Sequence, residues 1–169
     1  SVSLQMLNAA DHEAFITTLG HLFKHSPWVA EETWAKRPFA SVEALHAALC
    51  AAMRAAPADR QLALIRAHPD LAGRLARQKQ LTAESTREQA SAGLDQLTDA
   101  ELAEVARNND TYKAKFGFPF IICARLNAKA SILSAMAARL PNTPTVEFTT
   151  ALAEIEKIAW LRLQDALGN

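Results

Sequence analysis

The sequence predicts an all-α fold, a single domain of about eight helices. Apolar residues recur at three- and four-residue intervals, and no run alternates apolar and polar residues with the β-branched enrichment of strands. Prolines and capping residues divide the 169 residues into helix-sized pieces, without repeats or a linker between domains. A chain of this length can bury a single core. We therefore expect residues 1–169 to form one domain.

Two helices are expected before the break at Arg37-Pro38-Phe39. The first starts at Asn8 or a near neighbour, and its apolar stripe comprises Phe15, Ile16, Leu19, Leu22 and Phe23. Ser26 is expected to cap the second helix, with Pro27 at its first position, where the missing amide costs no hydrogen bond.

Two more helices are expected between Ser41 and Pro69. Ser41 is expected to cap the first, whose apolar stripe comprises Val42, Leu45, Leu49 and Met53. The second starts near Asp59. It must end near Ala67, because Pro69 pushes the residue before it, His68, out of the helical region.

Capping boxes predict two helix starts in the second half. Ser85-Thr86-Arg87-Glu88 and Thr98-Asp99-Ala100-Glu101 each place a hydroxyl residue three positions before a glutamate. Gly117 is expected to end the second of these helices.

The rest of the chain is expected to hold two helices. Phe118-Pro119-Phe120 turns the chain into an apolar segment, and a helix follows around residues 132–140. A loop from Pro141 to Pro144 then precedes a last helix, which runs from about Thr145 to Leu167.

Composition excludes several classes of function. The 18 basic and 18 acidic residues cancel, so no electrostatic footprint for nucleic acid or an anionic membrane is present. No apolar run approaches the roughly 20 residues of a membrane helix, and the amino end shows no signal-peptide pattern. Cys50 and Cys123 lie in apolar stretches without metal-type spacing, which predicts buried free thiols and suits a reducing cytoplasm.

Among the histidines, His68 is the strongest candidate for chemistry. His21 and His25 have the i, i+4 spacing of metal sites, but no third ligand is in view, so we predict no metal site. His68 lies between a helix end and a proline turn. A helix C-terminus favours the protonated imidazole, an acid suited to proton delivery. The alternative is a histidine that only caps the helix.

Three further candidates also have structural explanations. Glu88 completes a capping box with Ser85, although helix amino ends also collect polar groups that face ligands. If Pro119 occupies a first helical position, the amides of residues 120–122 lack intrahelical acceptors and could bind a carbonyl-rich or anionic ligand, unless a side chain or water satisfies them. Arg162 stands among apolar residues and needs a partner carboxylate, from the protein or a substrate.

Several segments together are much more specific than any one alone. The three that carry most weight are His68-Pro69-Asp70-Leu71-Ala72, then Ser85-Thr86-Arg87-Glu88-Gln89 with Gly93-Leu94, and the stretch from Tyr112 to Phe120. Residues 23–30, 37–39 and 154–163 agree in the same order. In this combination the chain resembles the 2-oxo-4-hydroxy-4-carboxy-5-ureidoimidazoline (OHCU) decarboxylases over nearly its whole length.

The resemblance implies a carboxy-lyase that converts OHCU to (S)-allantoin, the third step of urate degradation in purine catabolism. It also implies an all-helical enzyme that needs no cofactor and commonly forms a homodimer. His68 matches the catalytic histidine and Glu88 its acidic partner, while Arg162 is expected to hold anionic or carbonyl oxygens beside them. The remaining positions expected to contact the substrate are Pro69, Ser85, Gln89, Phe120, Ile121 and Ile122.

The sequence departs from the family pattern at one position. Many members place a glycine shortly after the arginine equivalent to Arg125, whereas this chain has Leu126-Asn127. Asn127 tolerates similar backbone angles and is expected to cap the next helix. The final residues, 167–169, lack a peroxisomal Ser-Lys-Leu ending, which favours a bacterial-type cytoplasmic enzyme.

Two other classes of function remain as alternatives. The first is a catalytically inert helical module that binds metabolites or a partner enzyme. The intact set His68, Glu88, Gln89 and Arg162 argues against it, because decay of a site would be expected to strike at least one of them. The second is a helix-turn-helix regulator, which the neutral charge and the lack of a basic recognition helix disfavour.

Overall fold

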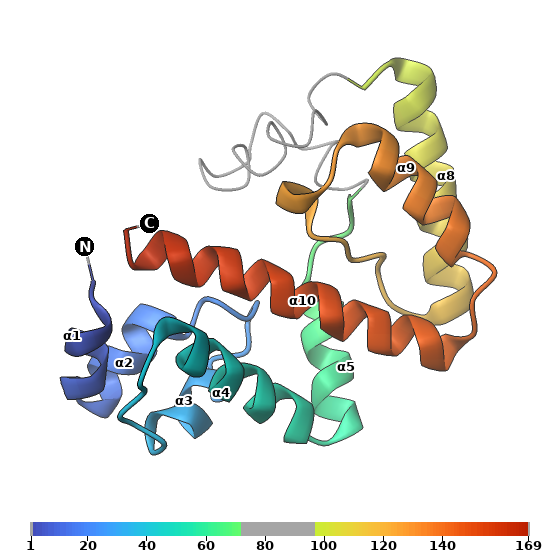
Figure 1. Ribbon diagram of the computed structural model, residues 1–169. Coiled ribbons are helices and arrows are strands. Elements are labelled where there is room, and N and C mark those ends of the chain that lie inside the picture. The colour runs from blue at the N-terminus through green and yellow to red at the C-terminus, as the bar shows by residue number, and fades with distance from the viewer. Residues whose placement is uncertain (1, 72–96, 169) are drawn as a thin grey trace. The chain divides into compact units, whose positions relative to one another are not determined.

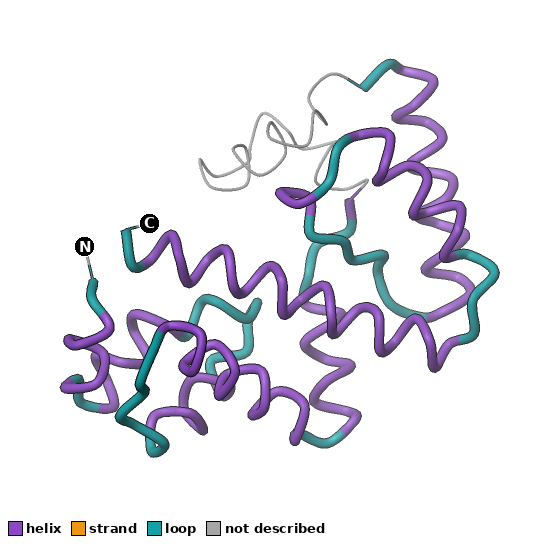
Figure 2. Tube along the Cα trace, viewed as in Figure 1, coloured by secondary structure: helices purple, strands orange, loops and turns teal. Residues whose placement is uncertain are grey.

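The structure is a computed structural model that describes residues 2–71 and 97–168 (Figure 1). Within these residues it contains eight α-helices, one short 3₁₀ turn and no strand, which confirms the all-α prediction (Figure 2). By its internal contacts the chain divides into two units. Unit 1 comprises residues 1–67 and 155–169, and unit 2 comprises residues 68–154.

The amino-terminal helix of unit 1 differs from the prediction. Two helices are present, α1 (Leu4–Ala9), which was not expected, and α2 (His12–Leu19). α2 corresponds to the helix expected from Asn8 or a near neighbour, but it ends at Leu19, before Leu22 and Phe23. The chain turns at Ala10, whose ψ of 145° lies outside the helical region. Asp11 then caps α2 with its carboxylate. Asn8 has another role: its side-chain amide both donates to and accepts from the backbone of Phe39.

The chain after α2 is a tight turn rather than a continued helix. Leu22 and Phe23 lie in this turn but are buried, as the apolar pattern requires. His21 and His25 are exposed, and His25 has a φ of 49°, in the left-handed region. They therefore do not share a helix face, and the metal-type spacing in the sequence has no structural counterpart.

The predicted N-cap of the next helix, α3 (Trp28–Trp34), is also wrong. Pro27 rather than Ser26 is the capping residue, and no side-chain hydrogen bond caps the helix. The Ser26 hydroxyl donates instead to the carbonyl of Lys24, because the preceding turn brings that oxygen within 2.9 Å. α3 packs against α2 and against the helix that follows it.

Two predicted helices complete the amino-terminal part of unit 1. These are α4 (Val42–Ala55), capped by the Ser41 hydroxyl as expected, and α5 (Ala58–Ala67), which ends where the following proline requires. Large buried apolar side chains in unit 1 include Phe15, Leu19, Phe23, Leu45, Leu49, Met53, Leu64 and Ile65.

In unit 2, the first helix after the residues that are not described is α8 (Asp99–Phe116). The predicted capping box is confirmed, because the Thr98 hydroxyl accepts from the Glu101 amide and the Glu101 carboxylate accepts from the Thr98 amide. Gly117 ends the helix with a φ of 77°, as predicted from its freedom to adopt left-handed angles. The capping box expected at residues 85–88 lies outside the described residues.

Pro119 does not start a helix. The helix start that was expected to leave the amides of residues 120–122 without acceptors is therefore absent. Residues 119–123, called the site segment below, form an irregular stretch before a 3₁₀ turn, η3 (Ala124–Leu126). Asn127 is extended, with a φ of −134° and ψ of 153°, so this position needs no glycine. Asn127 does not cap the next helix either, because its side-chain amide donates to the carbonyl of Cys123.

Two helices close the chain as predicted to within a few residues. The first, α9 (Lys129–Arg139), packs against α8, and Lys129 lies 3.1 Å from the carboxylate of Glu101. The second, α10 (Pro144–Ala166), is one continuous helix whose residues up to Glu154 belong to unit 2 and whose later residues belong to unit 1.

Two further expectations can be compared with the described residues. Cys50 and Cys123 are buried and free, as predicted. None of the helices that the structure describes is both long and apolar enough to span a membrane.

Candidate active site

His68 occupies the corner that the sequence predicts. α5 ends at Ala67, and His68 follows directly with only 8% of its surface exposed, whereas Pro69 is exposed. After the proline, the Asp70 carboxylate accepts a hydrogen bond from Lys113 of α8 at 3.4 Å. A partly exposed ion pair of this kind contributes little stability, but it fixes where the turn meets α8.

Three of the predicted site residues cannot be compared with the structure. Ser85, Glu88 and Gln89 lie outside the described residues. In the described ranges 2–71 and 97–168, no group of three or more His, Cys, Asp or Glu residues is arranged to hold a metal ion.

The site segment is buried in unit 2. Phe120, Ile121 and Cys123 each expose 4% of their surface or less. Within the described part of the chain, the amides of residues 120–122 donate no hydrogen bond. The helix start on which the sequence-based expectation depended is absent, and an irregular segment takes its place. Such amides can bind a carbonyl or an anionic oxygen.

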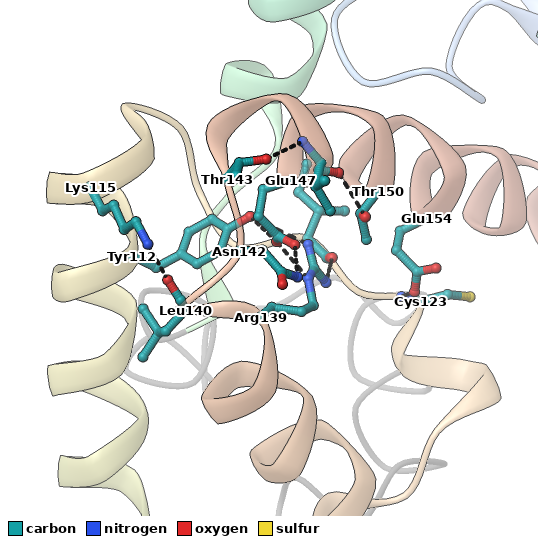
Figure 3. Close-up of polar contacts among 12 residues, drawn as sticks. Tyr112, Lys115, Cys123, Arg139, Leu140, Asn142, Thr143, Glu147, Thr150 and Glu154 are labelled. Atoms are coloured by element: carbon teal, nitrogen blue, oxygen red, sulfur yellow. Dashed lines mark hydrogen bonds and ion pairs between the residues drawn. The ribbon is translucent and has the colours of Figure 1, made fainter.

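A buried polar cluster lies beside the site segment (Figure 3). Its centre is Glu147, which is completely buried in the first turn of α10. One carboxylate oxygen accepts from Arg139 Nε at 2.7 Å and from the Tyr112 hydroxyl at 2.6 Å. The other accepts from the side-chain amide of Asn142 at 2.9 Å. We call Tyr112, Arg139, Asn142 and Glu147 the Glu147 cluster.

Tyr112 is neutral under ordinary conditions. Burial raises the pKa of its phenol, and the hydrogen bond to the Glu147 carboxylate raises this pKa further. The hydroxyl therefore remains a donor, and the carboxylate remains its acceptor.

The Glu147 cluster contacts the site segment through Arg139. Arg139 Nη1 donates to the carbonyl of Ile121 at 2.7 Å, and the guanidinium carbon lies 4.3 Å from the centre of the Phe120 ring. A second contact comes from the same helix as Glu147. The carboxylate of Glu154 accepts from the amide of Cys123 at 3.1 Å.

The sequence analysis did not single out Arg139, Glu147 or Glu154. The first two stand at helix ends, where charges that match the helix dipole are ordinary. Only the spacing of seven residues between Glu147 and Glu154, about two helical turns, places both carboxylates on one face of the predicted last helix. That pattern could have identified them as a pair.

Arg162 lies in unit 1, on the second half of α10. It is half-buried, and its neighbours Ala159 and Leu163 are completely buried. The structure thus confirms the apolar setting in which an arginine needs a partner.

Comparison with known proteins decides the family. The model of the OHCU decarboxylase family matches residues 8–164. The chain belongs to the OHCU decarboxylase family. A relative from Halalkalicoccus jeotgali, named 2-oxo-4-hydroxy-4-carboxy-5-ureidoimidazoline decarboxylase, is 42% identical over 164 residues, which cover 97% of this chain and 91% of the relative.

Two solved structures resemble this OHCU decarboxylase family member. The first is a crystal structure of (S)-allantoin synthase, with a TM-score of 0.77 and 31% identity; the match covers 98% of this chain and 54% of that chain. This protein therefore spans about half of the solved chain. The second is an OHCU decarboxylase crystallised in the presence of (S)-allantoin. Its TM-score is 0.70 at 25% identity, and the match covers 95% of this chain and 100% of that one.

The family match includes both units. Residues 8–164 contain His68, the site segment and Arg162.

Proposed function

We propose that this protein is a carboxy-lyase that converts OHCU to (S)-allantoin in urate degradation, without a metal or an organic cofactor. The observation that carries the proposal is the family match over residues 8–164. The relative named for this decarboxylation and the solved OHCU decarboxylase with (S)-allantoin support the same substrate and product.

The chemistry of the substrate explains why no cofactor is needed. When the bond to the carboxylate breaks, carbon dioxide leaves and the electron pair passes into the conjugated imine of the substrate itself. A proton must then reach the neighbouring carbon, which bears the ureido group, from one face, while the hydroxyl carbon becomes the carbonyl of allantoin. The enzyme therefore has to orient the carboxylate, keep water away and supply this proton stereospecifically.

We assign the proton chemistry to His68, with Glu88 holding its ring. The buried position of His68 at a rigid corner supports this role, because a fixed ring can reach only one face of a bound molecule. Arg162 would hold anionic or carbonyl oxygens of the substrate, as a bidentate partner where geometry allows. Contacts to the ureido group and the ring edges are assigned to Pro69, Ser85, Gln89 and the amides of Phe120, Ile121 and Ile122.

The decisive experiment follows circular dichroism in the allantoin region after the protein is added to freshly generated OHCU. The wild-type protein should accumulate (S)-allantoin faster than the uncatalysed decay, which gives a racemic product. His68→Ala should lose this activity while its far-ultraviolet spectrum stays helical. His21→Ala is the matched control, because it removes an exposed histidine and should leave the rate unchanged.

Either of two results would contradict the proposal. Near-normal turnover by His68→Ala would remove the assignment of that residue. A racemic signal at the uncatalysed rate with the wild-type protein would remove the reaction itself, and the inert metabolite-binding module would take its place.

We also propose that the enzyme is a cytoplasmic homodimer. The family resemblance implies the dimer, and the two buried free cysteines suit a reducing compartment. We further propose that both units together form a single enzymatic domain. The family match, which extends over both units, supports this proposal.

A further inference from the structure

The site segment is held by side chains from three helices rather than by its own secondary structure. Arg139 of α9 contacts it at Phe120 and Ile121, and Glu154 of α10 holds the amide of Cys123. Arg139 is in turn fixed by Glu147 of α10, which also accepts from Tyr112 of α8. An irregular backbone has no ladder of its own hydrogen bonds, so these external contacts determine its path.

The buried charges of the Glu147 cluster contribute little net free energy to the stability of the fold. Burying a carboxylate and a guanidinium costs desolvation, and well-packed apolar residues of similar volume are often as stable. Arg139 donates from one nitrogen to the carboxylate of Glu147 and from another to the carbonyl of Ile121. A planar fork fixes the direction of both hydrogen bonds, which an apolar replacement could not do.

We propose that Arg139, Glu147 and Glu154 are positioning residues, which set the backbone of the site segment so that the amides of residues 120–122 meet the substrate. This inference rests on the proposed function for the identity of that substrate. Arg139 directs the carbonyl of Ile121 into the Glu147 cluster, and Glu154 takes up the amide of Cys123. Within the described residues, the amides of residues 120–122 make no hydrogen bond of their own and are left available.

The first test is Arg139→Lys. The lysine keeps a positive charge beside Glu147, but one ammonium group lacks the planar fork that joins Glu147 and the Ile121 carbonyl in fixed directions. We expect kcat/KM for OHCU to fall about 10- to 100-fold, because small displacements of binding groups have effects of this size. The excess of (S)- over (R)-allantoin should fall as well, since the substrate would no longer present one face to the acid.

Arg54→Lys is the matched control. Arg54 also makes a two-point pair with a glutamate, Glu156, through Nε at 3.1 Å and Nη2 at 2.9 Å. That pair lies in unit 1 on partly exposed side chains, whereas the site segment belongs to unit 2. Its kcat/KM and stereochemical excess should match those of the wild-type protein.

A second variant separates positioning from folding. Tyr112→Phe/Arg139→Met/Glu147→Leu removes the buried charges and the phenol together, so no member of the ion pair is left alone in the interior. We expect this variant to remain folded yet show the same loss of kcat/KM and of stereochemical excess. A folded triple variant, or a folded Arg139→Lys, with wild-type values of both quantities would overturn the proposal.

Hydrogen exchange gives a readout that does not need the reaction. Amide exchange of a peptide covering residues 118–127 should be faster in Arg139→Lys than in the wild-type protein, with peptides of α4 unchanged. Unchanged exchange in the 118–127 peptide would overturn the positioning role. If the wild-type protein failed to decarboxylate OHCU, the proposed function would fall, and this measurement would still decide whether Arg139 orders the segment.

Discussion

Cys50 is a residue whose protonation should couple to folding. The pKa of its thiol is raised from 9.0 to about 12, mainly by burial and also by the nearby charge of Glu156. In the unfolded chain the thiol ionises at its ordinary pKa. Between these two values the folded protein therefore holds one more proton at this position than the unfolded chain does.

The sign of the effect on stability follows from this difference. As the pH rises above about 9, the free energy of unfolding should fall, because unfolding releases a proton from Cys50. We expect the urea midpoint of the wild-type protein to fall more between about pH 8 and about pH 10.5 than that of Cys50→Ser, which cannot ionise there. Both proteins should be measured under reducing conditions. Equal slopes would show that the thiol does not titrate differently in the two states.

Single residues also show how far sequence reasoning reaches. The setting of His68 could be predicted because a proline one position away dictates it. The role of Arg139 could not, because its partners Tyr112, Ile121 and Glu147 are far along the chain or beyond a loop. Chemistry that depends on local backbone rules was predictable, and chemistry that depends on tertiary contacts was not.

At the scale of elements, the amino end of α8 offers a measurable local interaction. Thr98→Ala removes the hydroxyl that accepts from the Glu101 amide and should lower the free energy of unfolding by about 1 kcal/mol. Thr111→Ala is the control on the same helix, because its exposed hydroxyl only donates to the carbonyl of Arg107 one turn earlier. We expect that control to change stability by less than about 0.5 kcal/mol. Chemical denaturation of both variants tests the difference, and equal effects would mean that the cap contributes nothing specific.

Two helix starts were predicted to the residue because a hydroxyl cap marks each of them. α4 and α8 begin after hydroxyl caps, and their starts agree with the prediction to the residue. α1 was not predicted, and the start of α2 was placed near Asn8 because Asp11 was not recognised as its cap. The path of the site segment was not predictable either, since it depends on Arg139 and Glu154 rather than on local propensity.

At the scale of the whole molecule, α10 links the two units as one continuous helix. Its first half contributes the buried residues Ala151 and Leu152 to unit 2, and its second half contributes Ala159 and Leu163 to unit 1. Loss of either half would uncover apolar side chains of the unit to which that half belongs. The two units should therefore unfold together.

Scanning calorimetry tests this expectation and the proposed dimer in one experiment. We expect one endotherm. Its calorimetric enthalpy, expressed per mole of the cooperative unit, should equal its van't Hoff enthalpy. If folded copies associate, the Tm should rise with protein concentration. Two resolved transitions would contradict the single domain, and a Tm independent of concentration would contradict the dimer.

The aromatic residues divide between the units in a way that makes the protein its own optical probe. All three tryptophans, Trp28, Trp34 and Trp160, belong to unit 1, whereas the single tyrosine, Tyr112, belongs to unit 2. Light at the red edge of the absorption band excites only indole, so its fluorescence reports unit 1 alone. The phenol of Tyr112 in unit 2 contributes nothing there, because it does not absorb at the red edge. A ligand titration followed by red-edge fluorescence would therefore report the response of unit 1 without any added label.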